Sequence, residues 1–412
     1  MPYRLLKLAL CKTSPTRLFR RPEKLRKSYD VVIIGGGGHG LATAYYLARD
    51  HGITNVAVLE KNHLGAGGTG RNTAIIRANY LTPEGVKFYD ESVRLYQDLS
   101  ADLDLNLLYS PRGHFTLAHS DSGMRTMRWR AEVNKHFGVR SEVVDRRFIK
   151  EKCPEIDLNC GHNLPVVGAL YHPPGAICRH DAVAWGYARG ADRRGAELHQ
   201  ETEVTGLRIE NGRIAGVETN RGEIETRRVL SAVAGFTPRV ARMAGISTPL
   251  TIRPLQACVT EPLKPWLNTI IVSSALHMYV SQSDRGELVM GAAIDPYDVH
   301  STRTTVTFME GMAAHLLELF PFLSGVNVMR QWAGLCDMTP DFSPIMGKTP
   351  IEGFYLDAGW GTWGFKATPV CGKTMAHTIA NDEPHPLIEP FALSRYRDFR
   401  QVGEKGAASV GH

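Results

Sequence analysis

Strongly apolar segments alternate with glycine-rich turns at the start of the main part of the chain. Residues 29–34 read YDVVII, and such a continuous β-branched run is typical of a strand buried on both faces of a parallel sheet. A glycine-rich turn at 35–40, a helix-forming stretch at 41–52 and a second apolar strand at 55–60 follow in order. This order predicts a βαβ unit.

The apolar pattern farther along the chain predicts helices and short strands in turn. Helical spacing is expected in three segments, at 84–101, 121–138 and 183–195, and Asp181 is a suitable N-cap for the last of them. Strands are expected at 113–118 and in a meander over 203–233, with turns at Asn211-Gly212 and Arg221-Gly222. The run VLSAVAG then predicts a buried strand ending in glycine, followed by the helix TPRVARMAG.

Two later regions differ in their pattern. Residues 248–335 hold four β-rich runs, PLQACVT, TIIVSS, HMYVSQ and ELVMGAA, which we expect to form an antiparallel sheet. Residues 353–380 return to the order strand, glycine-rich loop and helix, with FYLDAG, WGTWGFK and TPVCGKTMAHTIA. A nucleotide-binding domain assembled from distant segments is therefore expected.

The composition is that of a globular protein with two or three domains. The chain has 412 residues, of which 43% are hydrophobic and 22% charged, and no apolar run approaches the roughly 18 residues of a membrane span. The net charge is +6, and nine basic residues lie between Arg4 and Lys27 against one acid, Glu23. Because the rest of the chain is near neutral, neither nucleic acid nor a membrane is an expected partner.

The basic segment 1–28 has two interpretations. It could be a mitochondrial transit peptide, which is rich in arginine and poor in acids. We favour an N-terminal arm of a bacterial protein that lies on the protein itself or on a partner, and thus a cytoplasmic location. Lys7 and Lys12 interrupt the apolar core that a secretory signal needs.

The cysteines and histidines do not predict a metal site. There are seven cysteines and no CxxC pair, which suits free thiols in a reducing compartment. The 16 histidines include no HExxH motif, so no metal is inferred.

The turn at 35–40 reads GGGGHG, with Gly38 and His39 inside a GxGxxG motif, and each glycine has a physical purpose. Gly35 permits the tight turn, Gly37 lets the backbone approach a pyrophosphate, and Gly40 lets the helix pack closely on the strand. The helix N-terminus presents free N–H groups to phosphates, and Glu60 can accept hydrogen bonds from a ribose. A lone GxGxxG can be an ordinary turn, but this strand–helix–strand context favours dinucleotide binding.

A second glycine-rich stretch, LGAGGTGR at 64–71, distinguishes FAD from NAD. Such a loop lets backbone amides surround a longer, extended dinucleotide, and the pattern resembles the FAD-binding glycine oxidase and D-amino-acid oxidase superfamily. We predict an α/β (α+β) fold, with a Rossmann-like FAD-binding domain and an inserted antiparallel-sheet substrate domain. The predicted boundaries are a basic arm at 1–28, an FAD-binding domain from 29–120, 175–247 and 340–385, a substrate or interface domain from 121–174 and 248–339, and a tail at 386–412.

Over about residues 28–412 the chain resembles the β subunits of heterotetrameric sarcosine oxidases. The matching stretches include GGGGHGLATAYYLA, RNTAIIRANY, GAICRHDAVAWGYARGA, GELVMGAAIDPY, GWGTWGFKATP and ANDEPHPLIEPFALSRY. The resemblance implies an assembly with α, γ and δ subunits, noncovalent FAD in this subunit, and covalent FMN between this subunit and α. It also implies that sarcosine reduces FAD, that FMN passes the electrons to oxygen, and that tetrahydrofolate on the α subunit can capture the one-carbon unit.

Three residues are candidates for contact with substrate. Arg77, in IIRANY, and Lys366, in GFK, follow two glycine-rich flavin loops, so convergence of the loops would bring two cations together. Such a pair suits a substrate carboxylate, and monomeric sarcosine oxidases look similar at both positions. Arg77 could instead be a surface residue or a phosphate ligand, and Lys366 could touch FMN. Tyr279, in HMYVSQ, could line the pocket or simply pack in a sheet.

His180 and Arg179 are the candidates for FMN. The resemblance implies that the His180 ring carries the covalent link to FMN and that Arg179 lies near the FMN phosphate. Imidazole is a competent nucleophile toward an activated flavin. Alternatively, His180 merely caps a helix. The remaining positions expected to contact FAD are Gly68, Thr69, Arg71, Thr73, Ile75, Val204, Gly361 and Gly364.

Two departures from monomeric relatives matter. Val289, in ELVMG, aligns near a lysine that helps oxygen react with FAD, so FAD here is expected to lack that lysine. Cys336 falls near a cysteine that tethers FAD covalently in those relatives, although β subunits usually bind FAD noncovalently. Two other functions stay open: an FAD-dependent dehydrogenase of proline, dimethylglycine or an opine, and a non-catalytic flavoprotein that only assembles a complex.

Overall fold

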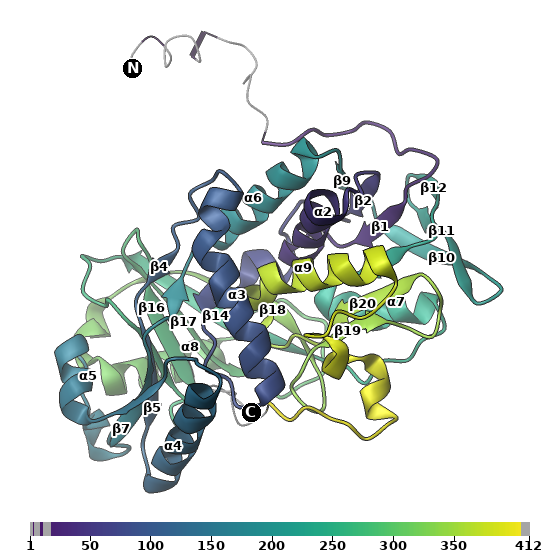
Figure 1. Cartoon of the computed structure of the whole chain (residues 1–412). Coiled ribbons are helices and arrows are strands. Elements are labelled where there is room, and N and C mark those ends of the chain that lie inside the picture. Colours follow the sequence, from purple (N-terminus) through teal and green to yellow (C-terminus); the bar gives the residue numbers. More distant parts are fainter. Residues whose placement is uncertain (1–2, 4–8, 11–17, 405–412) are drawn as a thin grey trace.

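The computed structural model describes residues 3, 9–10 and 18–404 (Figure 1). Neighbouring strands of its first sheet run parallel, except β19, which pairs antiparallel to β20 at one edge. The predicted βαβ unit forms the centre of this sheet. The order of its six strands is β19 (Ile345–Lys348), β20 (Phe354–Ala358), β13 (Val229–Ser231), β1 (Val31–Ile34), β2 (Val56–Leu59) and β9 (Glu197–His199).

Both faces of this sheet are buried, as the unbroken apolar run of β1 predicts. Val31 and Ile33 pack toward one side, where the helices are α2 (Gly38–His51), α3 (Pro83–Asp102), α6 (His180–Arg193) and α9 (Gly364–Asn381). Val32 and Ile34 pack toward the other side. The elements there are the meander β10 (Val204–Glu210), β11 (Arg213–Thr219) and β12 (Gly222–Glu225), and helix α7 (Thr237–Met243).

A second sheet has eight strands and lies beside the first (Figure 1). Its order is β18 (Val328–Met338), β14 (Thr251–Pro262), β17 (Glu287–Ile294), β16 (Met278–Gln282), β15 (Ile270–Ser273), β5 (His114–Ala118), β7 (Gly168–His172) and β6 (Glu142–Val144). Apolar side chains of α5 (Arg146–Lys152) and α8 (Val306–Leu319) share a core with it, and α4 (Asp121–His136) packs at β5 and β7.

The four β-rich runs of residues 248–335 pair antiparallel with one another, as predicted, but the sheet also contains one parallel pair with a strand outside that region. β15 runs parallel to β5, with Ile270 beside His114. β5 therefore belongs to the eight-stranded sheet, although the sequence analysis assigned it to the FAD-binding domain with residues 29–120. The pairing joins strands far apart in the chain, so no local pattern indicates it.

Several helices differ from the predictions. α5 and α8 were not predicted, and α6 begins at His180 with Arg179 as the N-cap residue, so Asp181 lies in the first turn instead of at the cap. α9 begins at Gly364 and contains Pro369, which the sequence placed near the helix start. Pro369 lacks the N–H that the Phe365 carbonyl would accept, and the hydroxyls of Tyr96 and Thr368 donate to that carbonyl instead, at 2.7 and 2.8 Å.

Part of the basic arm lies outside the described residues, together with the last eight residues of the tail. Two ion pairs join the later part of the arm to the body, Arg20 with Asp192 and Arg26 with Glu197. Within residues 3, 9–10 and 18–404, no helix has both the length and the apolar character to cross a bilayer.

A short three-stranded ladder joins the two large sheets. β3 (Ile75–Ile76) and β4 (Ser110–Pro111) both pair antiparallel with β8 (Ala176–Ile177). Arg77 follows β3 directly, and Arg179 and His180 follow β8. The ladder therefore fixes two groups of candidate residues relative to each other.

Candidate active site

A cavity of about 540 Å³ lies between the two large sheets. Elements of both sheets and both glycine-rich loops line it, so segments distant in sequence converge there. The sequence-predicted residues among its lining are Gly35, Gly37, Gly38, His39, Glu60, Gly68, Thr69, Arg71, Thr73, Ile75, Arg77, Val204, Tyr279, Cys336, Gly361, Gly364 and Lys366. Gly40, Arg179, His180 and Val289 are not among the lining residues.

The glycines of the first turn have different surroundings. Gly35 has a φ of +111°, a conformation that side chains disfavour. A Cβ on Gly40 would lie 2.1 Å from the Gly35 carbonyl oxygen, so Gly40 permits the close contact of helix and strand. A Cβ on Gly37 would meet only the Thr69 hydroxyl, at 3.2 Å, and Gly37 lines the cavity. This cradle fits a pyrophosphate, because the missing side chain leaves the backbone open to it.

Polar groups hold the two glycine-rich loops together. One Glu60 oxygen accepts from the Gly36 N–H and the other from the Asn62 N–H, both at 2.9 Å. The Thr69 hydroxyl accepts from the Gly38 N–H at 2.8 Å. These bonds fix the ends of β1 and β2 around the cavity, where Glu60 keeps further lone pairs for a ribose.

Two basic side chains, Arg77 and Lys366, line the cavity and interact electrostatically with each other. Lys366 is buried in the first turn of α9, and its one hydrogen bond among the described residues is a long contact, 3.4 Å, to the Thr362 carbonyl oxygen. Burial and the neighbouring charge of Arg77 hold the pKa of Lys366 well below its usual value. The Arg77 guanidinium donates to the Asn79 side-chain oxygen at 2.9 Å and lies over the Tyr80 ring. An anion in the cavity would relieve the mutual repulsion of the two cations.

His172, which the sequence analysis missed, supports the Arg77 segment. Its Nε2 accepts from the Ala78 N–H at 3.1 Å and its Nδ1 donates to the Arg140 carbonyl at 2.7 Å, so the ring is neutral. Burial, with contributions from Arg77 and Arg130, lowers the pKa of His172 to about 3. A neutral ring next to Arg77 is therefore part of the folded structure.

Two further buried charges lie behind Arg77. Arg130, on α4, donates to the Asn79 carbonyl at 2.6 Å, and burial together with Arg77 lowers its pKa to about 9. Glu404 accepts from the backbone N–H groups of Leu81 and Thr82, at 3.2 and 2.8 Å, at the N-terminus of α3. Neither residue belongs to a recognisable motif, so the sequence offers no signal for them.

Tyr279 and His114 also line the cavity. Tyr279 pairs with Gly291 on β17, and a Cβ there would lie 2.0 Å from the Tyr279 hydroxyl oxygen, so Gly291 makes room for the ring. His114, also missed, is buried, and burial followed by the charge of Arg77 holds its pKa well below the usual value. A neutral imidazole thus lies among cations in this cavity.

Cys336 and Val289 occupy different positions relative to the cavity. Cys336 lines it, and burial and Asp337 raise the pKa of its thiol above the usual value. The thiol is therefore protonated at neutral pH. Val289 pairs with Val259 and Ser281, two residues along β17 from Gly291.

Arg179 and His180 lie beyond the β3–β8 ladder. The Cys178 N–H donates to the Ala74 carbonyl, so the chain that leads to His180 runs beside the loop that lines the cavity. Arg179 forms an ion pair with Asp181, in which its Nε and one terminal nitrogen each donate to a different carboxylate oxygen. The His180 ring has no hydrogen bond to the described residues, and burial lowers its pKa. It is consequently a neutral imidazole.

Comparison with known proteins agrees with this geometry. A family model described as FAD dependent oxidoreductase matches residues 30–378. Sarcosine oxidase subunit beta from Arthrobacter sp is 46% identical over 398 residues, which cover 97% of this chain and 98% of the relative. The subunit of the same name from Rhodobacter capsulatus is 44% identical over 387 residues, covering 94% and 93%. The crystal structure of L-proline dehydrogenase from P. horikoshii superimposes with a TM-score of 0.86 at 27% identity, covering 91% of this chain and 99% of that chain.

The different surroundings of Gly37 and Gly40 predict different effects when each is replaced by valine. Gly37→Val should fold but lose most bound FAD, because the added side chain meets only Thr69 and fills the cavity. Gly40→Val should instead fail to fold stably, because its side chain collides with the Gly35 carbonyl. Flavin absorbance per protein and thermal unfolding measure the two effects. Full FAD occupancy in Gly37→Val would exclude this cradle as the pyrophosphate site.

The neutral state of His172 predicts an acid sensitivity. Its folded pKa of about 3 lies below the unfolded value of about 6.5, so folding stability is complete above pH 6.5 and falls as the pH drops from 6.5 toward 3. The loss attributable to this ring is roughly 3–5 kcal/mol. His172→Gln keeps an acceptor and a donor without titrating, and should show a shallower loss in denaturant unfolding between pH 6.5 and 4. Parallel pH profiles of the two proteins would contradict a buried neutral His172.

Proposed function

The chain belongs to the FAD-dependent oxidoreductases and, within them, to the family of sarcosine oxidase β subunits, and on this basis we propose that it oxidises sarcosine within a heterotetrameric enzyme. Its activity is FAD-dependent amine oxidation. The proposed products are glycine and formaldehyde, or 5,10-methylenetetrahydrofolate when tetrahydrofolate is bound by the α subunit. The 46% identity across nearly the whole relative carries this assignment, and the buried cation pair agrees with it.

Arg77 and Lys366 are proposed to bind the substrate carboxylate. Both side chains are buried and line the same cavity, and burial strengthens their interaction with an anion. Arg77 offers a planar fork for two hydrogen bonds, and Lys366 offers a point charge. Held in this way, a small amino acid would present its amine to the rest of the cavity.

His114 and Tyr279 are proposed to surround the substrate amine. Oxidation requires the nitrogen lone pair, so the amine must react in its unprotonated form. The neutral imidazole of His114 can accept a hydrogen bond from the amine, and the cations next to it disfavour a positively charged ammonium. The glycine-rich loops would hold FAD, which would supply the acceptor for the hydride equivalent of the substrate carbon. The chain thereby binds, orients and deprotonates the substrate around the cofactor.

A covalent FMN on His180 is the second part of the proposal. The half-buried, neutral ring without a hydrogen bond is suited to attack a flavin methylene. Its position beyond the β3–β8 ladder would place FMN a short distance from the FAD loop, on the α-subunit side of the chain. Arg179, together with Asp181, lies next to this ring, and its exposed side could face the FMN phosphate. The γ and δ subunits complete the proposed assembly.

FAD is proposed to be noncovalent. Cys336 lines the cavity, but its thiol is protonated and a thiolate would be needed to form a flavin thioether. Electrons are proposed to leave FAD through FMN, where oxygen is reduced to hydrogen peroxide. Val289 is not among the lining residues of the cavity, so this position by itself does not support the absence of an oxygen-activating lysine.

A dehydrogenase of proline, dimethylglycine or an opine is the second candidate. The likeness to L-proline dehydrogenase, with a TM-score of 0.86, favours it. Anaerobic titration with sarcosine, proline and dimethylglycine distinguishes the substrates by flavin bleaching, and oxygen uptake against dye reduction distinguishes the acceptors. A non-catalytic assembly role fits less well, because a scaffold needs no buried pair of cations.

Removal of the Arg77 guanidinium tests the carboxylate site. Arg77→Ala should keep FAD and raise the sarcosine KM tens- to hundreds-fold, since a lost charge-assisted contact costs about 2–4 kcal/mol. Arg285→Ala is the matched control, because Arg285 is exposed and pairs with Glu287 away from the cavity. An unchanged KM in Arg77→Ala would remove this residue from the carboxylate site.

The FMN proposal predicts a flavin that survives denaturation. The denatured native complex should show a yellow, fluorescent band on this chain, and a peptide that contains His180 should carry the mass of FMN. His180→Ala should lose the band, keep FAD and still be reduced by substrate, while oxygen turnover collapses. The exposed His136 provides the control variant His136→Ala, which should retain the band. Fast oxygen turnover in His180→Ala would refute the two-flavin route.

A further inference from the structure

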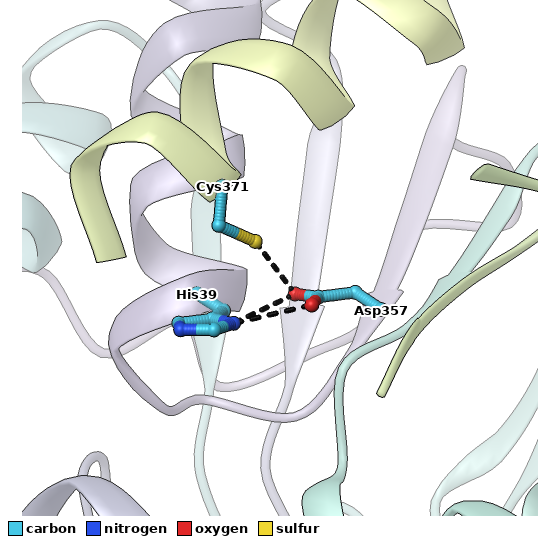
Figure 2. Close-up of side chains that lie close together, drawn as sticks. All are labelled: His39, Asp357 and Cys371. Carbon is cyan, nitrogen blue, oxygen red and sulfur yellow. Dashed lines mark hydrogen bonds and ion pairs between the residues drawn. The ribbon is translucent and has the colours of Figure 1, made fainter. Parts of the chain in front are cut away.

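A buried polar network surrounds His39 at the start of α2. His39 Nδ1 lies 3.0 and 3.2 Å from the two carboxylate oxygens of Asp357, and Nε2 lies 2.7 Å from the Gly364 carbonyl oxygen. Asp357 also accepts from the Trp360 indole N–H at 2.5 Å and from the Cys371 thiol at 3.0 Å. Figure 2 shows the ring of His39 and the thiol of Cys371 both directed at the Asp357 carboxylate.

The partners of His39 determine its protonation. A carbonyl oxygen can only accept, so Nε2 must carry a hydrogen. An ionised carboxylate also only accepts, so Nδ1 must carry a hydrogen as well. Trp360 and Cys371 also donate hydrogen bonds to Asp357. Several donors around one carboxylate stabilise its ionised form. The geometry therefore calls for a doubly protonated, positively charged ring.

The other titratable groups nearby are consistent with this charge. Burial alone would lower the pKa of His39, but Asp357, the Gly364 carbonyl and Asp337 raise it above the usual value. Burial and the Asp357 charge raise the pKa of Asp337, on β18, to about 6, and burial holds the Cys371 thiol on α9 in its protonated form. Of the two lysines on α9, Lys366 has its pKa lowered by burial and by the charge of Arg77, and Lys373 forms an ion pair with Glu91.

The network supports the part of α9 that faces the cavity. Three successive carbonyls of its first turn, those of Gly364, Phe365 and Lys366, accept side-chain hydrogen bonds. The donors are His39 from α2, and Tyr96 and Ser92 from α3. His39 is the charged donor of the three, and the only one that also lines the cavity.

We infer that His39 is a positioning residue that keeps a fixed positive charge at the wall of the FAD cavity, between Asp357 and the first turn of α9. Reduced FAD carries more negative charge than oxidised FAD, so a fixed cation at this wall favours the reduced form. The same imidazolium holds the helix turn that carries Lys366. This inference concerns the FAD environment and holds for any amine substrate, so it goes beyond the proposed function.

Two measurements on the FAD-loaded protein test this inference. With 15N-labelled histidine, one ring should show both nitrogens protonated above pH 7, and this signal should vanish in His39→Gln. The FAD midpoint potential of His39→Gln should shift to a more negative value, and the rate constant of FAD reduction should fall at least tenfold. Asp357→Asn removes the carboxylate that raises the pKa of His39, so the signal of the doubly protonated ring should vanish at neutral pH in this variant as well.

Cys371→Ala is the matched control, since it removes a donor to Asp357 without changing the charge of the network. It should leave both the histidine signal and the midpoint potential close to the original. An unshifted potential in His39→Gln with FAD bound would overturn the inference, as would a His39 ring that is neutral at pH 7. Retention of one equivalent of zinc that Cys371→Ala loses would also overturn it, because His39, Asp357 and Cys371 would then be ligands. If His39→Gln fails to fold, the histidine spectrum of the unaltered protein still shows whether any ring is doubly protonated above pH 7.

Discussion

The confinement of two positive charges, Arg77 and Lys366, at one buried end of the cavity is the constraint on which the site depends. The positive charge of Arg77 disfavours the charged form of Lys366. Because both side chains are buried, water screens this repulsion poorly. Hydrogen bonds from buried neighbours hold the chain segment that carries Arg77 in place. His172 fixes the backbone next to Arg77, and Glu404 lies at the N-terminus of α3 behind it. A bound carboxylate would complete an arrangement that is unfavourable without it.

The first turn of α9 is held in a comparable way. A helix normally satisfies its own carbonyls, but Pro369 removes the donor to the Phe365 carbonyl, and the hydroxyls of Tyr96 on α3 and Thr368 on α9 take its place. The turn that carries Lys366 is therefore fixed by α2 and α3 rather than by α9 alone. Packing of three helices, all of which are buried against the six-stranded sheet, thus sets the position of a single ammonium group.

The sequence predicted the parts of the site that repeat a known spacing. The glycines at 35–40 have distinct conformational demands, so their spacing alone indicates the turn, and the two glycine-rich loops do meet at one cavity. His114 and His172 could not be found in this way, because each is a single residue whose importance comes from a neighbour far along the chain. The start of α9 was misplaced for a similar reason. Pro369 is locally typical of a helix boundary, and the carbonyl that it leaves without a donor is satisfied in part by the distant Tyr96 hydroxyl.

The contact between Thr82 and Glu404 spans 322 residues and has a consequence for biosynthesis. A ribosome that adds roughly 5–20 residues per second needs about 15 to 65 seconds to proceed from one partner to the other. During that interval the N-terminal βαβ unit is already available to fold, whereas the segment behind Arg77 has no buried anion to hold it. The βαβ unit of the dinucleotide site can therefore form early in translation, and the half of the cavity that selects the substrate forms only when synthesis is nearly finished.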